Sequence, residues 1–285
     1  MLSKRYIFYC MIIATCLSSG SFSIAYAQDP LILAIHPYLP VPEIHTRFTP
    51  LADYLQQETG RSVKVRVGGN YEEHISAIGN NKVDIAFLGP AGYVNLVEQF
   101  GRKPILARFE VNNVLYLYGV IATRKGSEIG SIESLKDKRF AFGDPGSTMS
   151  HVVPRYLLMQ AGIPDGAPAY YQFLGSHKNV ALGILAGDFD AGAMKQEVFD
   201  EFESRGLRAL AITPGVPDHL FVTRANLPST DVERLREALL RLRDVPNGAT
   251  ILRKMHKGLT ALVPANDAEY GELRTMMQAV ESVSQ

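Results

Sequence analysis

The chain has 285 residues, enough for two domains with buried cores, and its 29 basic and 29 acidic residues balance. This balance argues against nucleic acid as a partner, because proteins bind phosphate backbones through an excess of lysine and arginine. The only two cysteines are Cys10 and Cys16, so the chain beyond its first residues can form neither a disulfide nor a thiolate metal site.

The first 27 residues have the three parts of a secretory signal. Lys4 and Arg5 precede the apolar stretch Tyr6–Leu17, and Ala25-Tyr26-Ala27 supplies a cleavage site of small residues. Cleavage there gives a mature chain that begins near Gln28, with 27 basic and 29 acidic residues. We therefore expect an exported protein.

Two membrane-bound alternatives to a soluble exported protein are less favoured. The apolar stretch of the signal is short for an uncleaved membrane anchor. A lipid anchor at Cys16 is possible in principle, but threonine at position 15 stands where a lipoprotein cleavage box usually has a smaller residue. A soluble protein remains the expectation.

Short β-rich runs alternate with amphipathic stretches along the mature chain, a pattern typical of βα units around mostly parallel sheets. Thr49-Pro50 predicts a cap and a first-turn proline for one helix, and Gly60 predicts its end. The other elements expected in this part of the chain are strands at Leu31–Ile35, Val63–Val67, Val83–Leu88 and Ile105–Phe109, and helices at Tyr71–Ile78 and Ala91–Gln99.

Two β-type passes, at about residues 116–123 and 208–222, flank a central block that has its own strand and helix patterns. The passes predict a two-strand hinge between a split first lobe and an inserted second lobe. The expected fold class is therefore α/β with two lobes, each a mostly parallel sheet flanked by helices. The predicted boundaries are residues 28–120 and 214–285 for lobe 1 and residues 121–213 for lobe 2.

The segment Gly143–His151, called here the 143–151 turn, lies between the apolar run Phe140–Phe142 and a helix-like run. Its glycines and proline let several backbone N–H groups point the same way, and Ser147 and Thr148 add hydroxyl donors. The following helix start contributes the positive end of its dipole. This combination suits a tetrahedral oxyanion, and an ordinary helix N-cap is the alternative.

The 143–151 turn and three other segments, taken in order, resemble the phosphonate-binding periplasmic proteins, which capture substrates for ABC importers of phosphonate, phosphite and phosphate. The resemblance covers nearly all of the mature chain. It implies a two-lobed, type II-like periplasmic binding protein fold, a monomer that binds a small oxyanion without a cofactor, and docking on a membrane ABC permease. The segments that carry it are Val83–Pro90, Gly143–Tyr156, Gly175–His177 and Asp190–Ala193.

The resemblance also implies which residues hold the oxyanion. Ser147 and Thr148, with nearby backbone N–H groups, match the positions that contact it, and His177 matches a histidine that donates to an anion oxygen. A capping or surface histidine is the alternative. Met149 and Ser150 continue the turn, although Met149 stands where relatives often have serine and so removes one hydroxyl donor.

Four further residues complete the expected ligand site. Tyr71 and Tyr116 each offer a phenol donor and a flat wall, with ordinary packing as the alternative. Glu197 and His219 match positions where relatives that bind an aminoalkyl phosphonate use acids to hold its ammonium group. Glu197 keeps the acid, with an ordinary exposed helix residue beside Lys195 as the alternative. His219 stands where a second acid is expected, and Asp218 lies one residue before it, which argues against amine recognition.

Other classes of function fit the residues less well. A serine hydrolase could be written with Ser147, His177 and Asp190, but the serine lacks the Gly-x-Ser-x-Gly elbow. The seven histidines lack zinc-type spacing. We expect His36, which precedes Pro37, and His45, three residues after Pro42, in loops. A subunit that reports an oxyanion to a membrane histidine kinase would share the clamp, and the sequence does not separate uptake from sensing.

Overall fold

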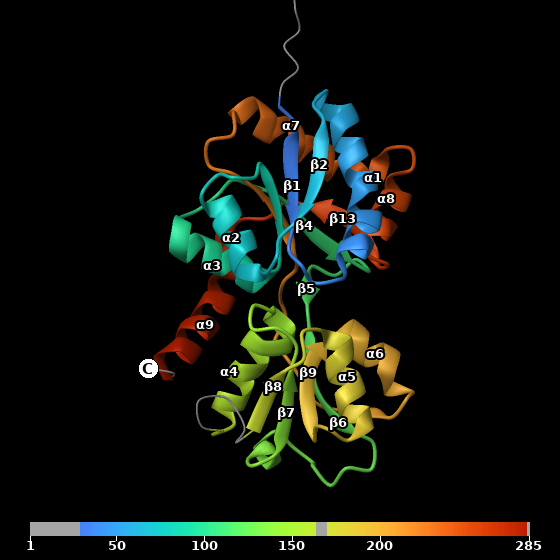
Figure 1. Cartoon of the computed structure of the whole chain (residues 1–285), viewed down its shortest axis with the longest axis vertical. Coiled ribbons are helices and arrows are strands. Elements are labelled where there is room, and N and C mark those ends of the chain that lie inside the picture. Colours follow the sequence, from blue (N-terminus) through green and yellow to red (C-terminus); the bar gives the residue numbers. More distant parts are fainter. Residues whose placement is uncertain (1–28, 164–169, 284–285) are drawn as a thin grey trace, which may run out of the picture.

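The computed structural model describes residues 29–163 and 170–283. The predicted signal and both cysteines lie outside these residues. The described chain forms a six-stranded sheet, a five-stranded sheet and a two-stranded ribbon, with helices packed on both large sheets (Figure 1). The α/β class predicted from the sequence is confirmed. We call the six-stranded sheet with its helices lobe 1, and the five-stranded sheet with its helices lobe 2.

Lobe 1 is built from two stretches of the chain. Helices α1, α7 and α8 bury their apolar residues on one face of the sheet, and α2, α3 and α9 cover the other face. The strands are β1 (Leu31–Ile35), β2 (Val63–Val67), β3 (Ile85–Leu88), β4 (Ile105–Val111), β12 (Leu220–Thr223) and β13 (Leu259–Val263). The helices are α1 (Val41–Thr59), α2 (Tyr71–Gly79), α3 (Pro90–Phe100), α7 (Ser229–Leu240), α8 (Gly248–Met255) and α9 (Gly271–Val283).

Lobe 2 lies between the two halves of lobe 1 in the sequence. Helices α5 and α6 pack on one face of its sheet, and α4 packs on the other. The strands are β6 (Gly119–Arg124), β7 (Arg139–Phe142), β8 (Tyr170–Phe173), β9 (Ala191–Lys195) and β10 (Leu207–Ile212). The helices are α4 (Val153–Gln160), preceded by the wide turn η2 (Thr148–Val152), α5 (His177–Ala186) and α6 (Gln196–Glu203).

The two sheets share one strand order although no sequence repeat relates them. Lobe 1 contains the order β2-β1-β3-β12-β4, and lobe 2 has the order β8-β7-β9-β6-β10. In each, a strand that arrives from the other lobe, β12 or β6, is inserted next to the third strand of a βαβαβ unit. The starts of α1, α2 and α3 in lobe 1 therefore correspond to the starts of η2, α5 and α6 in lobe 2.

The hinge consists of two chain segments that cross between the lobes. Strand β5 (Tyr116–Leu117) pairs antiparallel with β11 (Val216–Pro217), and the two lie between the large sheets (Figure 1). Each crossing segment delivers its strand without a crossover helix, so β12 runs antiparallel to β3 and β4, and β6 antiparallel to β9 and β10. Both sheets are consequently more mixed than the mostly parallel arrangement expected, and only the pairs formed by β1 and by β7 are parallel.

Helix α1 begins earlier than the sequence predicted. Pro50 is not in its first turn but inside it, and Pro42 occupies the first turn instead. The buried stripe that starts at Ile44 continues through Phe48 and Leu51, so burial outweighs the hydrogen bond that a proline cannot make. The predicted end is confirmed, because Gly60 caps the helix in the left-handed conformation with φ 71°.

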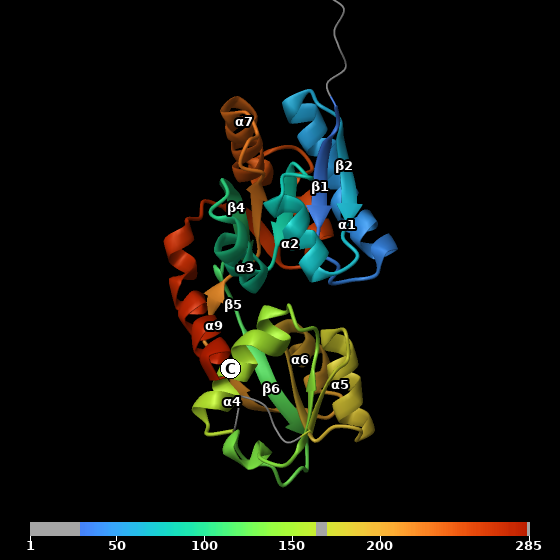
Figure 2. The ribbon, with the colours of Figure 1, turned by 60° about the vertical axis from the view of Figure 1, so that its left-hand side comes forward.

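The C-terminal helix α9 joins the lobes outside the hinge. It packs on α3 of lobe 1 and on α4 of lobe 2, and Figure 2 shows it running along the side of the molecule from one lobe to the other. Met149 and Val153 of lobe 2 share an apolar cluster with Tyr93 and Tyr270 of lobe 1. Within the part of the chain that the structure describes, no helix combines the length and apolar character of a membrane span.

Candidate functional site

The start of η2 in lobe 2 meets the starts of α2 and α3 in lobe 1. The Thr148 hydroxyl accepts a hydrogen bond of 3.0 Å from the backbone N–H of Ala91, in the first turn of α3. Gly146 approaches the Tyr71 ring so closely that an added Cβ would lie 2.8 Å from ring atoms. Several helix N-termini thus converge between the lobes, which makes the space favourable for an anion.

The 143–151 turn is held by its own polar groups. Asp144 Oδ1 accepts from the Gly146 N–H at 2.8 Å, so this acid stabilises the turn. Ser147 is the N-cap of η2, and its hydroxyl accepts from the Ser150 N–H at 3.3 Å. A side chain at Gly143 would overlap Ser150 Oγ, so the tight approach requires glycine.

Met149 and Ser150 point into the protein. Ser150 is fully buried, and its hydroxyl lies 3.4 Å from the Asp144 N–H. Met149 is buried against the hinge, where its sulfur accepts from the Thr213 hydroxyl at 3.5 Å. The side chains of both residues therefore support the turn from inside lobe 2, and the hydroxyls at the contact between the lobes are those of Ser147 and Thr148.

Ser147, Thr148 and His177, called here the donor group, lie together at the inter-lobe face of lobe 2. His177 Nε2 is 3.5 Å from Ser147 Oγ, and its Nδ1 accepts from the Lys195 backbone N–H at 3.0 Å. Because Nδ1 accepts, the proton of the neutral ring is on Nε2. Burial, followed by the charges of Lys195 and His219, lowers the pKa of His177 to about 3. His177 is thus a neutral N–H donor at neutral pH.

Lobe 1 presents a wall of rings to the same space. His36 stacks on Phe87 and His219 with ring centroids 5.3 and 5.5 Å apart, and it lies 4.8 Å from Tyr38 and 5.2 Å from Tyr71. We call these five residues the ring wall. His36 lies in the loop directly after β1, as predicted, but it is only 2% exposed and its Nδ1 donates to the Phe87 carbonyl. Burial, followed by the charge of His219, lowers the pKa of His36 well below the usual value. The loop predicted for His45 is wrong, because His45 lies within α1.

The ring wall also carries polar edges. Among the described residues, the hydroxyls of Tyr38 and Tyr71 have no hydrogen-bond partner, and burial raises the pKa of both phenols, so they remain protonated donors. His219 Nδ1 lies 2.7 Å from the Asp218 carboxylate. His219 Nε2 and Thr148 Oγ1 both lie within 4 Å of the position that a Cβ on Gly89 would take. The ring wall and the donor group therefore flank the same glycine.

Glu197 follows the segment that holds His177, and it contacts one lysine and one histidine. Its Oε2 lies 2.9 Å from Lys195 Nζ, and its Oε1 lies 2.6 Å from Nε2 of His256, at the end of α8 in lobe 1. Burial opposes ionisation of Glu197, but the hydrogen bond from His256 and the charge of Lys195 outweigh it and lower the pKa to about 2. Glu197 is thus a charged contact between the lobes.

Tyr116, a predicted ligand residue, lies apart from the other predicted ligand residues. It is 50% exposed on the hinge strand β5, and no hydrogen bond or ring contact within the described chain connects it to the donor group or the ring wall. Tyr93 is fully buried in α3.

Four residues near the space were missed from the sequence: His36, Tyr38, Lys195 and His256. One signal was available for the first two, because they follow β1 as the 143–151 turn follows β7 in the matching lobe. Lys195 and His256 owe their positions to contacts between distant parts of the chain. No group of His, Cys, Asp or Glu in residues 29–163 and 170–283 is arranged to hold a metal ion.

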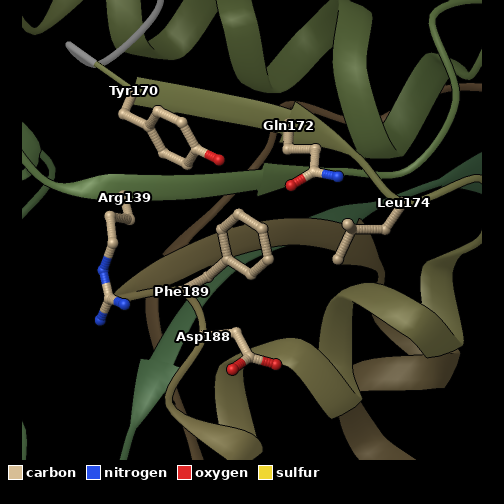
Figure 3. A pocket seen from close by; sticks show the side chains of 6 residues that line it. All are labelled: Arg139, Tyr170, Gln172, Leu174, Asp188 and Phe189. Atoms are coloured by element: carbon tan, nitrogen blue, oxygen red, sulfur yellow. The ribbon is translucent and has the colours of Figure 1, made fainter.

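A separate shallow pocket lies on lobe 2, where β7 and β8 meet the loop before β9. Figure 3 shows its lining side chains: Arg139, Tyr170, Gln172, Leu174, Asp188 and Phe189. Arg139 is already bound to Asp190 at 2.8 Å. This pocket includes none of the predicted ligand residues, so the inter-lobe space remains the candidate site.

Comparison with known proteins agrees with this geometry. A family model described as "ABC transporter, phosphonate, periplasmic substrate-binding protein" matches residues 33–270. A probable ABC transporter phosphite binding protein, PhnD1, of Prochlorococcus marinus is 26% identical over 227 residues, which cover 74% of each chain. The phosphonates-binding periplasmic protein of Escherichia coli is 21% identical over 251 residues, covering 83% of this chain and 74% of that protein.

The fold also matches solved structures. PhnD1 from Prochlorococcus marinus in complex with methylphosphonate superposes with a TM-score of 0.77 at 21% identity, covering 88% of this chain and 98% of that one. This match confirms the two-lobed periplasmic binding protein fold that the sequence predicted.

Proposed function

The chain belongs to the family of periplasmic phosphonate-binding proteins of ABC transporters, and from that premise we propose that it captures a phosphonate, phosphite or phosphate-type oxyanion between its lobes. The observation that carries the proposal is the convergence of the donor group, the ring wall and the N-terminus of α3 around Gly89. We also propose the lobe boundaries expected from the sequence, residues 28–120 with 214–285 and residues 121–213, with Gly89 in lobe 1 and the donor group in lobe 2.

The chemistry of the donor group supports an oxyanion. Thr148 accepts from Ala91, so its own hydroxyl proton is free to donate, and the neutral His177 ring donates through Nε2. Ser147 adds a second hydroxyl at the helix start. Three short donors and a helix N-terminus match the three oxygens of a PO₃ group.

The ring wall supports a ligand whose phosphorus carries, besides three oxygens, a fourth substituent that is less polar. The rings of His36, Tyr38 and Tyr71 offer apolar faces, while the two phenol hydroxyls can donate at their edges. A hydrogen, hydroxyl or small alkyl group on phosphorus would face this wall. We therefore assign Ser147, Thr148, His177, Tyr71 and His219 to direct contact with the ligand.

Four other predicted residues have different proposed roles. Met149 and Ser150 shape the turn, and Glu197 bridges the lobes beside the ligand. Tyr116 remains a proposed contact from the hinge. Donors from both lobes favour the closed arrangement when the anion joins them, so we infer that binding shifts a hinge equilibrium.

The family implies a periplasmic location and a membrane permease as partner. We propose that the closed monomer delivers its ligand to that permease and that residues 1–27 direct export. Sensing for a histidine kinase is the alternative use of the same clamp.

The geometry does not favour the serine hydrolase alternative. Asp190, the acid of the hypothetical triad, is bound to Arg139 at 2.8 Å. His177 Nδ1, which such a triad would direct to a carboxylate, instead accepts from a backbone N–H. A ring held in this tautomer already carries its proton on Nε2 and cannot take one from Ser147.

A thermal-shift panel tests the proposed function. Protein stripped of carried-over ligand by partial unfolding and dialysis is heated with phosphite, phosphate, methylphosphonate or sulfate. A ligand at about 100 times its dissociation constant adds roughly 2.7 kcal/mol to the free energy of unfolding, which raises the melting temperature measurably. The proposal predicts a shift with at least one phosphorus oxyanion, lost in Ser147→Ala/Thr148→Ala. If none of the phosphorus oxyanions shifts the melting temperature, the proposed function is refuted.

A further inference from the structure

Four acidic groups lie close to the proposed ligand, and each accepts a hydrogen bond from the protein, but only Glu197 and Glu43 pair with a lysine or an arginine. Glu197 uses one carboxylate oxygen for Lys195 and the other for His256. Asp144 accepts from the backbone of its own turn, and Asp218 Oδ1 takes both the backbone N–H and the ring of His219. Glu43, whose charge reaches Tyr38, is paired with Arg47 at 2.6 Å.

Glu197 is the acid best placed to act on a ligand substituent. It is the second residue of α6 and lies two residues after Lys195, whose backbone N–H donates to His177 Nδ1. Its charge acts on both His177 and Tyr38. Its side chain, which is 43% exposed, therefore lies at the solvent-facing edge of the site, on the segment that holds His177. A free carboxylate at this position would attract a cation on the ligand.

The two partners of Glu197 remove that attraction. Each of its oxygens faces a separate nitrogen, Lys195 Nζ at 2.9 Å and His256 Nε2 at 2.6 Å. The Lys195 charge also reaches His36 and His177, where it favours an anion and opposes a second cation. An ammonium group brought to this edge would have to displace one of these partners.

We propose that the site selects phosphorus oxyanions whose substituent is uncharged, and that Lys195 and His256 impose this selection by occupying Glu197. The inference rests on the proposed function, since it concerns the substituent of the same ligand. The substrate class is then inorganic phosphorus oxyanions and small alkylphosphonates, with aminoalkylphosphonates excluded by unfavourable charge and the loss of water from the ammonium.

Two pairs of ligands of matched shape test the selection. Propylphosphonate and 2-aminoethylphosphonate differ by a methyl in place of an ammonium, and ethylphosphonate and aminomethylphosphonate form the shorter pair. Isothermal titration calorimetry gives the ratio of dissociation constants within each pair, which cancels effects on the shared phosphonate group. For the wild type we expect the uncharged member of at least one pair to bind about tenfold more tightly or better.

Variants test the role of the two partners. Lys195→Met/His256→Phe frees the Glu197 carboxylate, and we expect the ratio to move by about tenfold toward the ammonium ligand. Adding Glu197→Gln to the same background should restore the preference for the uncharged ligand. Lys178→Met is the matched control, because Lys178 lies on exposed α5 and pairs with Glu201 rather than with a residue of the site. Circular dichroism verifies folding, and the single Lys195→Met variant replaces the double variant if that fails to fold.

Each outcome has a defined meaning. Equal or tighter binding of the ammonium ligands by the wild type overturns the inference, and an unchanged ratio in the folded variants overturns the role of Lys195 and His256. If phosphite or phosphate binds but no alkylphosphonate does, the inference is also overturned, while the proposed function stands. Failure of every phosphorus oxyanion to bind refutes the proposed function itself.

Discussion

The hydroxyl of Thr148 in lobe 2 accepts a hydrogen bond from the backbone N–H of Ala91 in lobe 1, at 3.0 Å. Both groups are buried, and the Ala91 N–H lies in the first turn of α3, where backbone N–H groups have no partner within the helix. The same hydroxyl is proposed to donate to the ligand. One side chain can therefore couple lobe contact to anion binding.

Replacement of Thr148 by valine should weaken oxyanion binding strongly. Valine keeps the shape but leaves the Ala91 N–H without its partner and removes one donor to the anion. We expect a loss of about 1.5–3 kcal/mol of binding free energy, the range for a hydrogen bond to a charged group. Calorimetric titration with the best ligand of the panel measures it. Thr148→Ser, which keeps the hydroxyl, should bind within severalfold of wild type; equal affinities in both variants would contradict the assigned role.

Gly146→Ala should hinder contact between the lobes. The added Cβ would lie 2.8 Å from atoms of the Tyr71 ring, closer than carbon atoms approach in proteins, so the ring or the turn must move apart. We expect weaker ligand binding and a larger radius of gyration in small-angle scattering with ligand present. Gly130→Ala is the control, because an added Cβ at Gly130 meets no atom within 4 Å. Identical behaviour of the two variants would show that this approach has no role in closure.

Local signals made much of the fold predictable. The strand Leu31–Ile35 is observed with the bounds expected, because its short apolar run is one that pairs and buries within a sheet. The start of α1 was misplaced because Thr49-Pro50 looks like a helix start. Only the tertiary burial of Ile44 and Phe48 shows that the helix runs through the proline.

The site was predictable where one segment carries several of its parts. Ser147 and Thr148 follow a glycine-rich turn, and the structure places them at a helix start as expected. The contact of Glu197 with His256 was not predictable, since His256 comes from the other lobe and reaches Glu197 only after both halves have folded. Polar contacts between residues far apart in the chain leave no local pattern in a sequence.

Acidification should destabilise the protein between about pH 6.5 and 4.5. The pKa values of His74 and His151 are lowered to about 4, chiefly by burial, and that of His177 to about 3. Below pH 6.5 the unfolded chain binds protons at these sites that the folded chain does not, so the free energy of unfolding falls as pH falls. Each such histidine contributes up to about 1.4 kcal/mol per pH unit. Glu197, with its lowered pKa, adds to the loss only below about pH 4.5.

Urea unfolding at pH 7, 6 and 5 measures this effect. His151→Gln removes a titrating ring outside the donor group and should flatten the pH dependence. His45→Gln, on the exposed side of α1, is the control. A pH dependence as steep in His151→Gln as in the wild type would contradict the assignment to that ring.

The ion pair between Glu197 and His256 should stabilise the closed arrangement before any ligand binds. It joins α6 of lobe 2 to the end of α8 in lobe 1, and its 2.6 Å contact exists only while the lobes are together. His256→Phe removes the contact but keeps a ring of similar size, so the open form should become more populated. We expect a larger radius of gyration without ligand, and ligand affinity reduced severalfold because the anion alone must then hold the lobes together. Lys178→Met breaks a pair within lobe 2 and should change neither quantity. If His256→Phe leaves the ligand-free radius at its wild-type value, the pair has no role in setting the hinge equilibrium.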